Sequence, residues 1–268
     1  MNYKALFTDF DGTLFANGKI SDTNIQALNA ARAAGKLVVF CSGRSWRSLA
    51  YYENLLGFDN PGTYGVAFNG GVAYAYTENG HEVLYRHTLE TATAHEIIGK
   101  VKALALPSVK IFTYGENDDM FVEDGTKDAA PFSESRQIPI TFVKDFSEVT
   151  GGIAKVVLFG ENNELKKVAA QLADKHESVS SAAYLLEFLP PNVNKGTGLS
   201  FLAEHLNIQL SEMIAMGDEA NDIPMIKKAG LGIAVANAIP PAKEAADIIL
   251  TESCHEDAVS VVIHKYLL

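Results

Sequence analysis

Short, wholly apolar segments recur along the chain and alternate with amphipathic ones, and this pattern restricts the fold more than any other feature. Residues 5–7 and 37–41 are continuously apolar. The segment 21–35 between them has one apolar face, a serine at its start and a glycine at its end. Strands that are buried on both faces have such continuous runs, and a strand–helix–strand unit joins parallel strands. The sequence therefore predicts a βαβ unit and an α/β fold with a parallel sheet.

Composition narrows the class of protein. The chain has 268 residues, 47% of them hydrophobic, which suits one large domain or two modest ones. A net charge of -11 argues against a nucleic-acid-binding surface or an anionic-membrane surface, although one pocket can still bind a phosphorylated ligand through a metal ion and a few basic groups. No run approaches the ~18 apolar residues of a membrane helix. The two distant cysteines, Cys41 and Cys254, predict free thiols and a cytoplasmic location.

The middle of the chain has a different pattern. Between about residues 86 and 188, helix-like segments alternate with paired strand-like segments, and residues 124–145 form a polar, proline-containing stretch. Strands that are adjacent in sequence indicate an antiparallel α+β layer. We therefore expect an inserted α+β domain over residues 86–188, with the core domain formed by residues 1–85 and 189–268.

Two carboxylates stand two residues apart where the first apolar segment ends. In extended backbone, residues i and i+2 point to the same side, so Asp9 and Asp11 project together at the carboxyl end of the strand, where open α/β sheets bind ligands. Like charges this close repel each other, and a hard cation such as Mg²⁺ relieves the repulsion. A carboxylate can also attack phosphorus and form an aspartyl-phosphate. An Asp-rich turn is the plainer interpretation of this segment taken alone.

Polar groups also occur in three later segments. Ser42 and Gly43 follow the second apolar segment, Lys195 begins an amphipathic segment, and residues 217–222 follow another short apolar run. The carboxyl ends of parallel strands share one edge of a sheet, so these groups can converge with the acid pair. Each segment has an ordinary alternative, namely a turn, a solvated lysine or an acidic helix cap. Taken together, the acid pair, the hydroxyl, the lysine and the second acidic segment in this order favour a functional site over four unrelated structural features.

The ordered set resembles the four motifs of the haloacid dehalogenase superfamily. The matching segments are Asp9-Phe10-Asp11-Gly12-Thr13-Leu14, Ser42-Gly43-Arg44, Asn194-Lys195-Gly196 and Gly217-Asp218-Glu219-Ala220-Asn221-Asp222. The inserted segment is similar to the α/β cap of the Cof-type subgroup, which contains many sugar-phosphate phosphatases. The resemblance covers essentially the whole chain and implies a Rossmann-like parallel-sheet core with an inserted α+β cap domain.

The resemblance also implies a role for each matching position. Asp9 would be the nucleophile and a Mg²⁺ ligand, Asp11 the general acid/base with its backbone carbonyl on the metal, and Asp218 a further metal ligand. The phosphate would be bound by Phe10, Ser42, Gly43, Lys195 and Asn221. The loops would be supported by Gly12 and Thr13, and Asp222 would support the metal site.

Three functions are compatible with this pattern. The first is a Mg²⁺-dependent phosphatase that acts on a small phosphorylated metabolite such as a sugar phosphate. The second is a phosphomutase of related fold, and the third is a non-catalytic sensor of a phosphometabolite. Asp11 and Lys195 argue against the sensor, because binding alone requires no acid/base. The sequence indicates no oligomeric state. Candidate substrate contacts in the cap, each with an ordinary packing or solvated alternative, are Asp118, Asp119, Met120 and Arg136.

Overall fold

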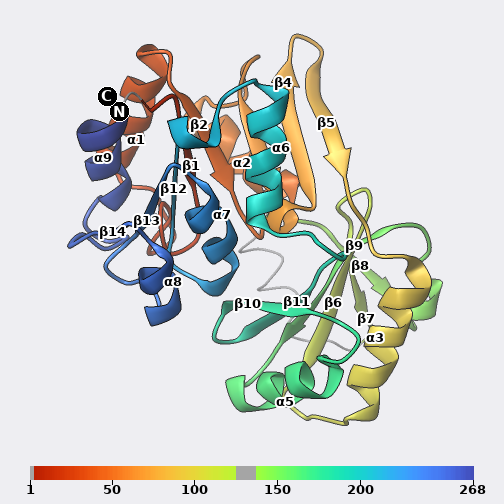
Figure 1. The fold of residues 1–268 in the computed structure, drawn as a ribbon. Coiled ribbons are helices and arrows are strands. Elements are labelled where there is room, and N and C mark those ends of the chain that lie inside the picture. The colour runs from red at the N-terminus through yellow and green to blue at the C-terminus, as the bar shows by residue number, and fades with distance from the viewer. Residues whose placement is uncertain (1–2, 125–136) are drawn as a thin grey trace.

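The computed structural model describes residues 3–124 and 137–268. In this part of the chain the strands form two sheets, one of eight strands and one of six (Figure 1). The chain leaves the first sheet after β5 and returns to it at β12, so the second sheet is built from a continuous middle segment. The limits 1–85, 86–188 and 189–268 remain our proposed domain boundaries.

The first sheet forms the core and has the strand order β14-β13-β12-β1-β2-β3-β4-β5. Its strands are β1 (Ala5–Thr8), β2 (Leu37–Cys41), β3 (Tyr64–Ala67), β4 (Val72–Thr77), β5 (Gly80–Arg86), β12 (Met213–Gly217), β13 (Leu231–Ala234) and β14 (Ile248–Ile249). Its helices are α1 (Asp22–Ala33), α2 (Trp46–Leu56), α6 (Lys195–His205), α7 (Ile223–Lys228), α8 (Pro240–Ala245) and α9 (Ala258–Val262). The strands from β14 to β3 are parallel, and β4 and β5 add an antiparallel edge.

The predicted βαβ unit is confirmed. All four residues of β1 are buried, and β1 pairs in parallel with β2 through α1. The hydroxyl of Ser21 accepts a hydrogen bond from the Asn24 N–H and caps α1. Because β1 lies between β12 and β2, the chain reverses its direction of travel across the sheet at β1, and open α/β sheets bind ligands at such a point.

The second sheet forms the cap and has the order β10-β11-β9-β6-β7-β8. Its strands are β6 (Lys110–Gly115), β7 (Met120–Glu123), β8 (Ile140–Val143), β9 (Ile153–Phe159), β10 (Ser178–Ala182) and β11 (Leu185–Phe188). The helices α3 (Thr91–Ala103) and α5 (Asn162–Leu172) pack on the face that points away from the core (Figure 1). The opposite face is turned toward the core sheet.

Two features of the cap differ from the sequence expectation. Strand β8 lies in the polar, proline-containing stretch 124–145, for which we predicted no strand, and residues 125–136 of that stretch lie outside the described residues. It pairs in parallel with β7, so the cap sheet is mixed rather than antiparallel. Both β8 and the serine-rich β10 are short edge strands with few buried side chains, and neither has a long continuous apolar run.

No helix in the described ranges is long and apolar enough to cross a membrane. The described cysteines, Cys41 and Cys254, are buried free thiols.

Candidate active site

The structure brings the predicted site segments together at one edge of the core sheet, facing the cap. Asp9 follows β1, Ser42 follows β2 and Asp218 follows β12, and these three strands are parallel neighbours. Lys195 is the first residue of α6, whose start is capped by the side chain of Asn194. Parallel pairing therefore accounts for the convergence of residues that are about two hundred positions apart in the sequence.

A buried cluster of charges lies at the floor of this edge. The Lys195 ammonium group is inaccessible to solvent and donates to one carboxylate oxygen of Asp9 and one of Asp222. One oxygen from each of Asp9, Asp218 and Asp222 lies within 4.8 Å of the other two. Three acids therefore surround one lysine, so negative charge is in excess.

The excess of negative charge perturbs the pKa values in the cluster. Burial and the Asp222 carboxylate raise the pKa of Asp9 well above its ordinary value, against the opposing effect of Lys195. Burial and Asp222 likewise raise the pKa of Asp218 to about 7. Burial lowers the pKa of Lys195, but Asp222 and Asp9 outweigh it and the net pKa is raised. The cluster therefore favours an additional positive charge, which either protons or a cation can supply.

The donor set suits Mg²⁺, which prefers carboxylate oxygens. Asp9 and Asp218 line the cavity above the cluster. Asp222 is held by other groups: one of its oxygens accepts from Lys195, and the other accepts the backbone N–H groups of Asp218 and Glu219, each at 2.9 Å. The predicted supporting role of Asp222 is consistent with these contacts, which fix the loop that carries Asp218.

Gly12 and Thr13 hold the loop after β1 against Asp218. Gly12 has φ +85°, and a Cβ there would lie 2.4 Å from Asp218 Oδ2, so a larger residue would displace the carboxylate. The Thr13 hydroxyl donates to Asp218 Oδ1 at 2.9 Å. These contacts orient Asp218 toward the cavity.

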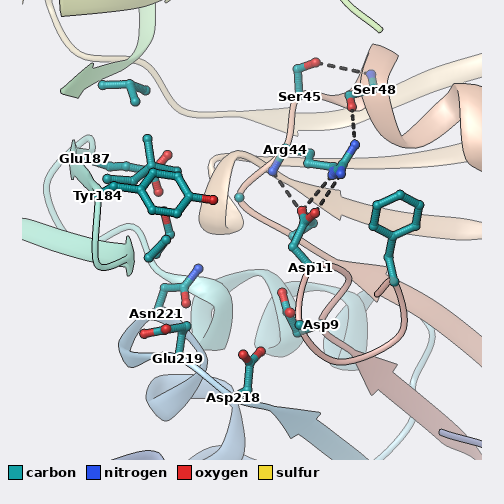
Figure 2. Close-up of a pocket in the computed structure, with 18 of the residues that line it drawn as sticks. Asp9, Asp11, Arg44, Ser45, Ser48, Tyr184, Glu187, Asp218, Glu219 and Asn221 are labelled. Carbon is teal, nitrogen blue, oxygen red and sulfur yellow. Dashed lines mark hydrogen bonds and ion pairs between the residues drawn. The ribbon is translucent and has the colours of Figure 1, made fainter. Parts of the chain in front are cut away.

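Arg44 holds the Asp11 side chain outside the three-acid cluster. Its Nε and Nη2 donate to the two Asp11 carboxylate oxygens at 2.7 and 2.6 Å, and its Nη1 donates to the Ser48 hydroxyl (Figure 2). The guanidinium lies over the rings of Phe10 and Tyr52, with distances to the ring centres of 4.9 and 5.0 Å. We assigned Arg44 no role from the sequence, although its position directly after Ser42 and Gly43 was an available indication.

Besides Lys195, two of the predicted phosphate-binding groups already have partners. The Ser42 hydroxyl accepts from the Arg44 N–H at 3.1 Å. Asn221 Nδ2 donates to Asn69 Oδ1 at 2.9 Å, while Asn221 Oδ1 is a buried acceptor without a hydrogen bond among the described residues. Phe10, Gly43 and Lys195 lie in the same loops and helix start. The sequence motifs predicted that these groups lie at one site, but no motif indicated the contact between Asn221 and Asn69.

A cavity of about 390 Å³ separates the site from the cap. Figure 2 shows Asp9, Asp11 and Asp218 on the core side, with Tyr184 and Glu187 opposite them and the Tyr184 hydroxyl directed into the gap. The cap residues that line the cavity include Tyr114, Ile138, Lys155, Val157, Ser181, Tyr184, Leu185 and Glu187.

The candidate cap contacts named from the sequence are not among these lining residues. Asp118, Asp119 and Met120 do not line the cavity, and Arg136 lies outside the described residues. Asp118 is buried elsewhere, with an ion pair to Arg86. The sequence did contain a signal for the cap residues at the cavity. Lys155 in β9 and Glu187 in β11 are charged residues inside apolar strands, and such residues are buried only when they have partners.

Comparison with known proteins gives a consistent result over the whole chain. A family model described as haloacid dehalogenase-like hydrolase matches residues 6–263. The protein named "Putative phosphatase YxeH" of Bacillus subtilis (strain 168) is 30% identical, and the alignment covers 99% of each chain. A second B. subtilis protein, 5-amino-6-(5-phospho-D-ribitylamino)uracil phosphatase YwtE, is 28% identical over 98% of each chain.

A solved structure supports the same assignment. The haloacid dehalogenase-like hydrolase from Bacteroides thetaiotaomicron superposes with a TM-score of 0.85 and 29% identity, covering 98% of this chain and 99% of that one. The fold is therefore shared along nearly the full length of both chains. This chain belongs to the haloacid dehalogenase-like hydrolase family.

Proposed function

We propose that this hydrolase is a Mg²⁺-dependent phosphatase that removes the phosphoryl group from a small metabolite, such as a sugar phosphate, through an aspartyl-phosphate on Asp9. The observation that carries the proposal is the buried cluster of Asp9, Lys195, Asp218 and Asp222, which opens onto a cavity of metabolite size. The names of the relatives, which specify phosphatases, support the reaction class.

The position of each residue suggests its role in the proposed reaction. Asp9 presents a carboxylate oxygen to the cavity and would attack phosphorus, while the Lys195 ammonium group beside it would offset charge on the phosphoryl oxygens. The backbone N–H groups of the loops at Phe10 and Gly43, together with the Ser42 hydroxyl, would bind the remaining oxygens. Asp9, Asp218 and the Asp11 carbonyl would hold Mg²⁺, which would neutralise charge on the transferring group.

Asp11 would transfer protons in both halves of the reaction. It would give a proton to the leaving oxygen as the ester bond breaks, and it would then remove a proton from the water that hydrolyses the aspartyl-phosphate. Its ion pair with Arg44 gives its carboxylate a defined direction beside the cavity. The two carboxylates would therefore have separate tasks, with Asp9 forming the covalent bond and Asp11 moving the proton.

A turnover assay over a panel of phosphorylated metabolites tests the proposal. We expect release of inorganic phosphate that depends on added Mg²⁺ and stops when EDTA removes the metal. Phosphorus NMR distinguishes this outcome from a phosphomutase, which would produce an isomeric sugar phosphate without accumulating inorganic phosphate. Binding of phosphorylated ligands without any turnover would support a sensor and contradict the proposal.

A further inference from the structure

The cap contains a buried ion pair that faces the cleft. Lys155 of β9 and Glu187 of β11 lie on neighbouring strands, and their side chains are 6% and 3% exposed. The rings of Tyr114 from the cap and Phe68 from the core lie 5.4 and 5.7 Å from the Lys155 ammonium nitrogen. Buried ion pairs can often be replaced by apolar residues without loss of stability. A contribution to the stability of the cap therefore does not by itself explain why an ion pair, rather than two apolar residues, lies at this position.

Both members of the pair also form a hydrogen bond with the core. Lys155 Nζ donates to the carbonyl oxygen of Gly43 at 2.7 Å, in the loop after β2. Glu187 Oε2 accepts from Asn69 Nδ2 at 2.6 Å, in the turn after β3. Burial raises the pKa of Glu187, but Lys155 and Asn69 lower it, and the net pKa lies below the ordinary value. The pair is therefore ionised and binds two core loops at once.

Asn69 extends these contacts to the rest of the candidate site. It is fully buried, its N–H donates to the Ser42 carbonyl at 2.9 Å, and its Oδ1 accepts from Asn221 Nδ2 at 2.9 Å. Asn221 belongs to the loop between Asp218 and Asp222. A continuous set of hydrogen bonds thus runs from the cap pair to the loops on both sides of Asp9.

We propose that Lys155 and Glu187 are positioning residues that set the loop at Gly43 and the Asn221 side chain at the spacing required by a phosphoryl group, and that they do so only while the cap is docked. The proposal rests on the proposed phosphatase function and adds a cap element that acts on the phosphate rather than on the leaving group. A displacement of about 1 Å in such a site can cost about 10²-fold in rate. The loss should therefore be the same for every substrate.

The test uses the double variant Lys155→Met/Glu187→Met, because removing one partner alone would leave a buried charge and could unfold the cap. The control is Lys102→Met/Glu123→Met, which removes the ion pairs of Lys102 with Glu123 and Asp145, cap residues that do not line the cleft. Lys155→Arg is the conservative variant, since a guanidinium can still donate to both Glu187 and Gly43. The readouts are kcat for several phosphate esters, inhibition by inorganic phosphate in the presence of Mg²⁺, and melting temperature.

We expect the double variant to lose about 10²-fold in kcat, to the same extent for every ester, and to bind inorganic phosphate about tenfold more weakly while folded. The control should match the wild type, and Lys155→Arg should regain most of the loss. Unchanged kcat and phosphate inhibition with a lower melting temperature would mean a merely structural pair and overturn the proposal. A loss confined to particular esters would also overturn it, because the pair would then act on the leaving group.

Failure of the proposed function gives a different pattern. Wild-type protein that turns over no phosphate ester contradicts the phosphatase, and calorimetry with inorganic phosphate and Mg²⁺ then becomes the readout for the same variants. Weaker phosphate binding by the double variant than by the control supports the positioning role, and equal binding overturns it. Absence of phosphate binding by the wild type overturns both proposals.

Discussion

Two buried lysines lie on either side of the same cleft, Lys195 beneath Asp9 in the core and Lys155 in the cap, and their surroundings differ in net charge. Lys195 of the core contacts Asp9 and Asp222, with Asp218 in the same cluster, so the acids outnumber it. Lys155 of the cap is paired with one acid, Glu187, and also contacts a neutral backbone carbonyl and two aromatic rings. The first lysine lies in an anionic cluster and the second in a balanced pair.

This difference in net charge distinguishes the proposed reactive site around Lys195 from the structural contact made by Lys155. An anionic cluster in a dry site gains from a bound cation and can bind a transferring phosphoryl group only when that cation is present. A balanced pair whose members have hydrogen-bonding partners gains little from a further ligand and instead fixes the groups it touches. Substitutions in the core cluster should therefore reduce kcat at least as much as loss of the cap pair, and more than substitutions at buried groups away from the cleft.

The largest effect is expected for Asp9→Asn. The amide retains the size of the side chain but cannot form the aspartyl-phosphate, so turnover should fall by at least about 10³-fold. Because the change also removes one charge from an anionic cluster, the variant should remain folded. The measurement is Mg²⁺-dependent phosphate release, with circular dichroism to check the fold. The exposed residue Asp174 gives the control Asp174→Asn, and substantial turnover by Asp9→Asn would remove the mechanism.

Lys195→Met should have the next largest effect. Loss of the ammonium group removes a stabilising charge from the phosphoryl oxygens, and removal of one such donor costs about 10²–10³-fold in kcat. It also leaves three acids without their lysine, so added Mg²⁺ should raise the melting temperature of the variant more than that of the wild type. Titration of kcat and melting temperature with Mg²⁺ checks both points. If added Mg²⁺ raised the melting temperature of the variant and of the wild type equally, the proposed excess of negative charge around Lys195 would be contradicted.

The same contrast explains how much of the molecule could be predicted from the sequence. In the core, Asp9, Ser42 and Asp218 directly follow apolar strands, so strand order alone brings them together, and the fold and the convergence of the site segments were predicted. In the cap, the residues that reach the cleft come from the middle of strands and from edge turns. Their positions depend on which face of the sheet meets the core.

Side-chain contacts between distant segments were also beyond sequence reasoning. Arg44 pairs with Asp11 because the loops after β1 and β2 lie side by side, and Asn69 meets Glu187 only because the cap docks on the core. No spacing in the sequence encodes either distance. The edge strand β8 was missed for a related reason, since two of its four side chains are exposed and it has no long continuous apolar run.

Arg44→Lys should have a smaller and substrate-dependent effect. A lysine cannot form the two-pronged contact with the Asp11 carboxylate, so the proposed acid/base would be less well directed. We expect kcat/KM, which reports the step that releases the leaving group, to fall about tenfold for alkyl phosphates, whose leaving oxygen needs a proton, and to change little for 4-nitrophenyl phosphate, whose leaving group does not. Equal losses of kcat/KM for both kinds of ester would contradict a role of Arg44 in directing Asp11 toward the leaving oxygen.

The smallest effect on activity is expected at a buried acid away from the cleft, Glu53, which accepts hydrogen bonds from the hydroxyls of Tyr74 and Tyr76. Burial raises the pKa of Glu53 from 4.5 to about 8, so this acid holds a proton in the folded protein at neutral pH. Between these two pKa values the folded state binds more protons than the unfolded state. The contribution of Glu53 to the free energy of unfolding therefore falls as the pH rises from about 4.5 to about 8.

Glu53→Gln should reduce this pH dependence while leaving kcat unchanged, because the amide carries no charge and retains an acceptor for a tyrosine hydroxyl. Urea unfolding at about pH 5 and about pH 9 should show a smaller loss of stability in the variant than in the wild type, by an amount on the order of a few kcal/mol. Identical losses would mean that Glu53 is already ionised in the folded protein. A buried acid with no excess of positive charge beside it would then remain charged, and the distinction between the anionic core cluster and the balanced cap pair would lose its physical basis.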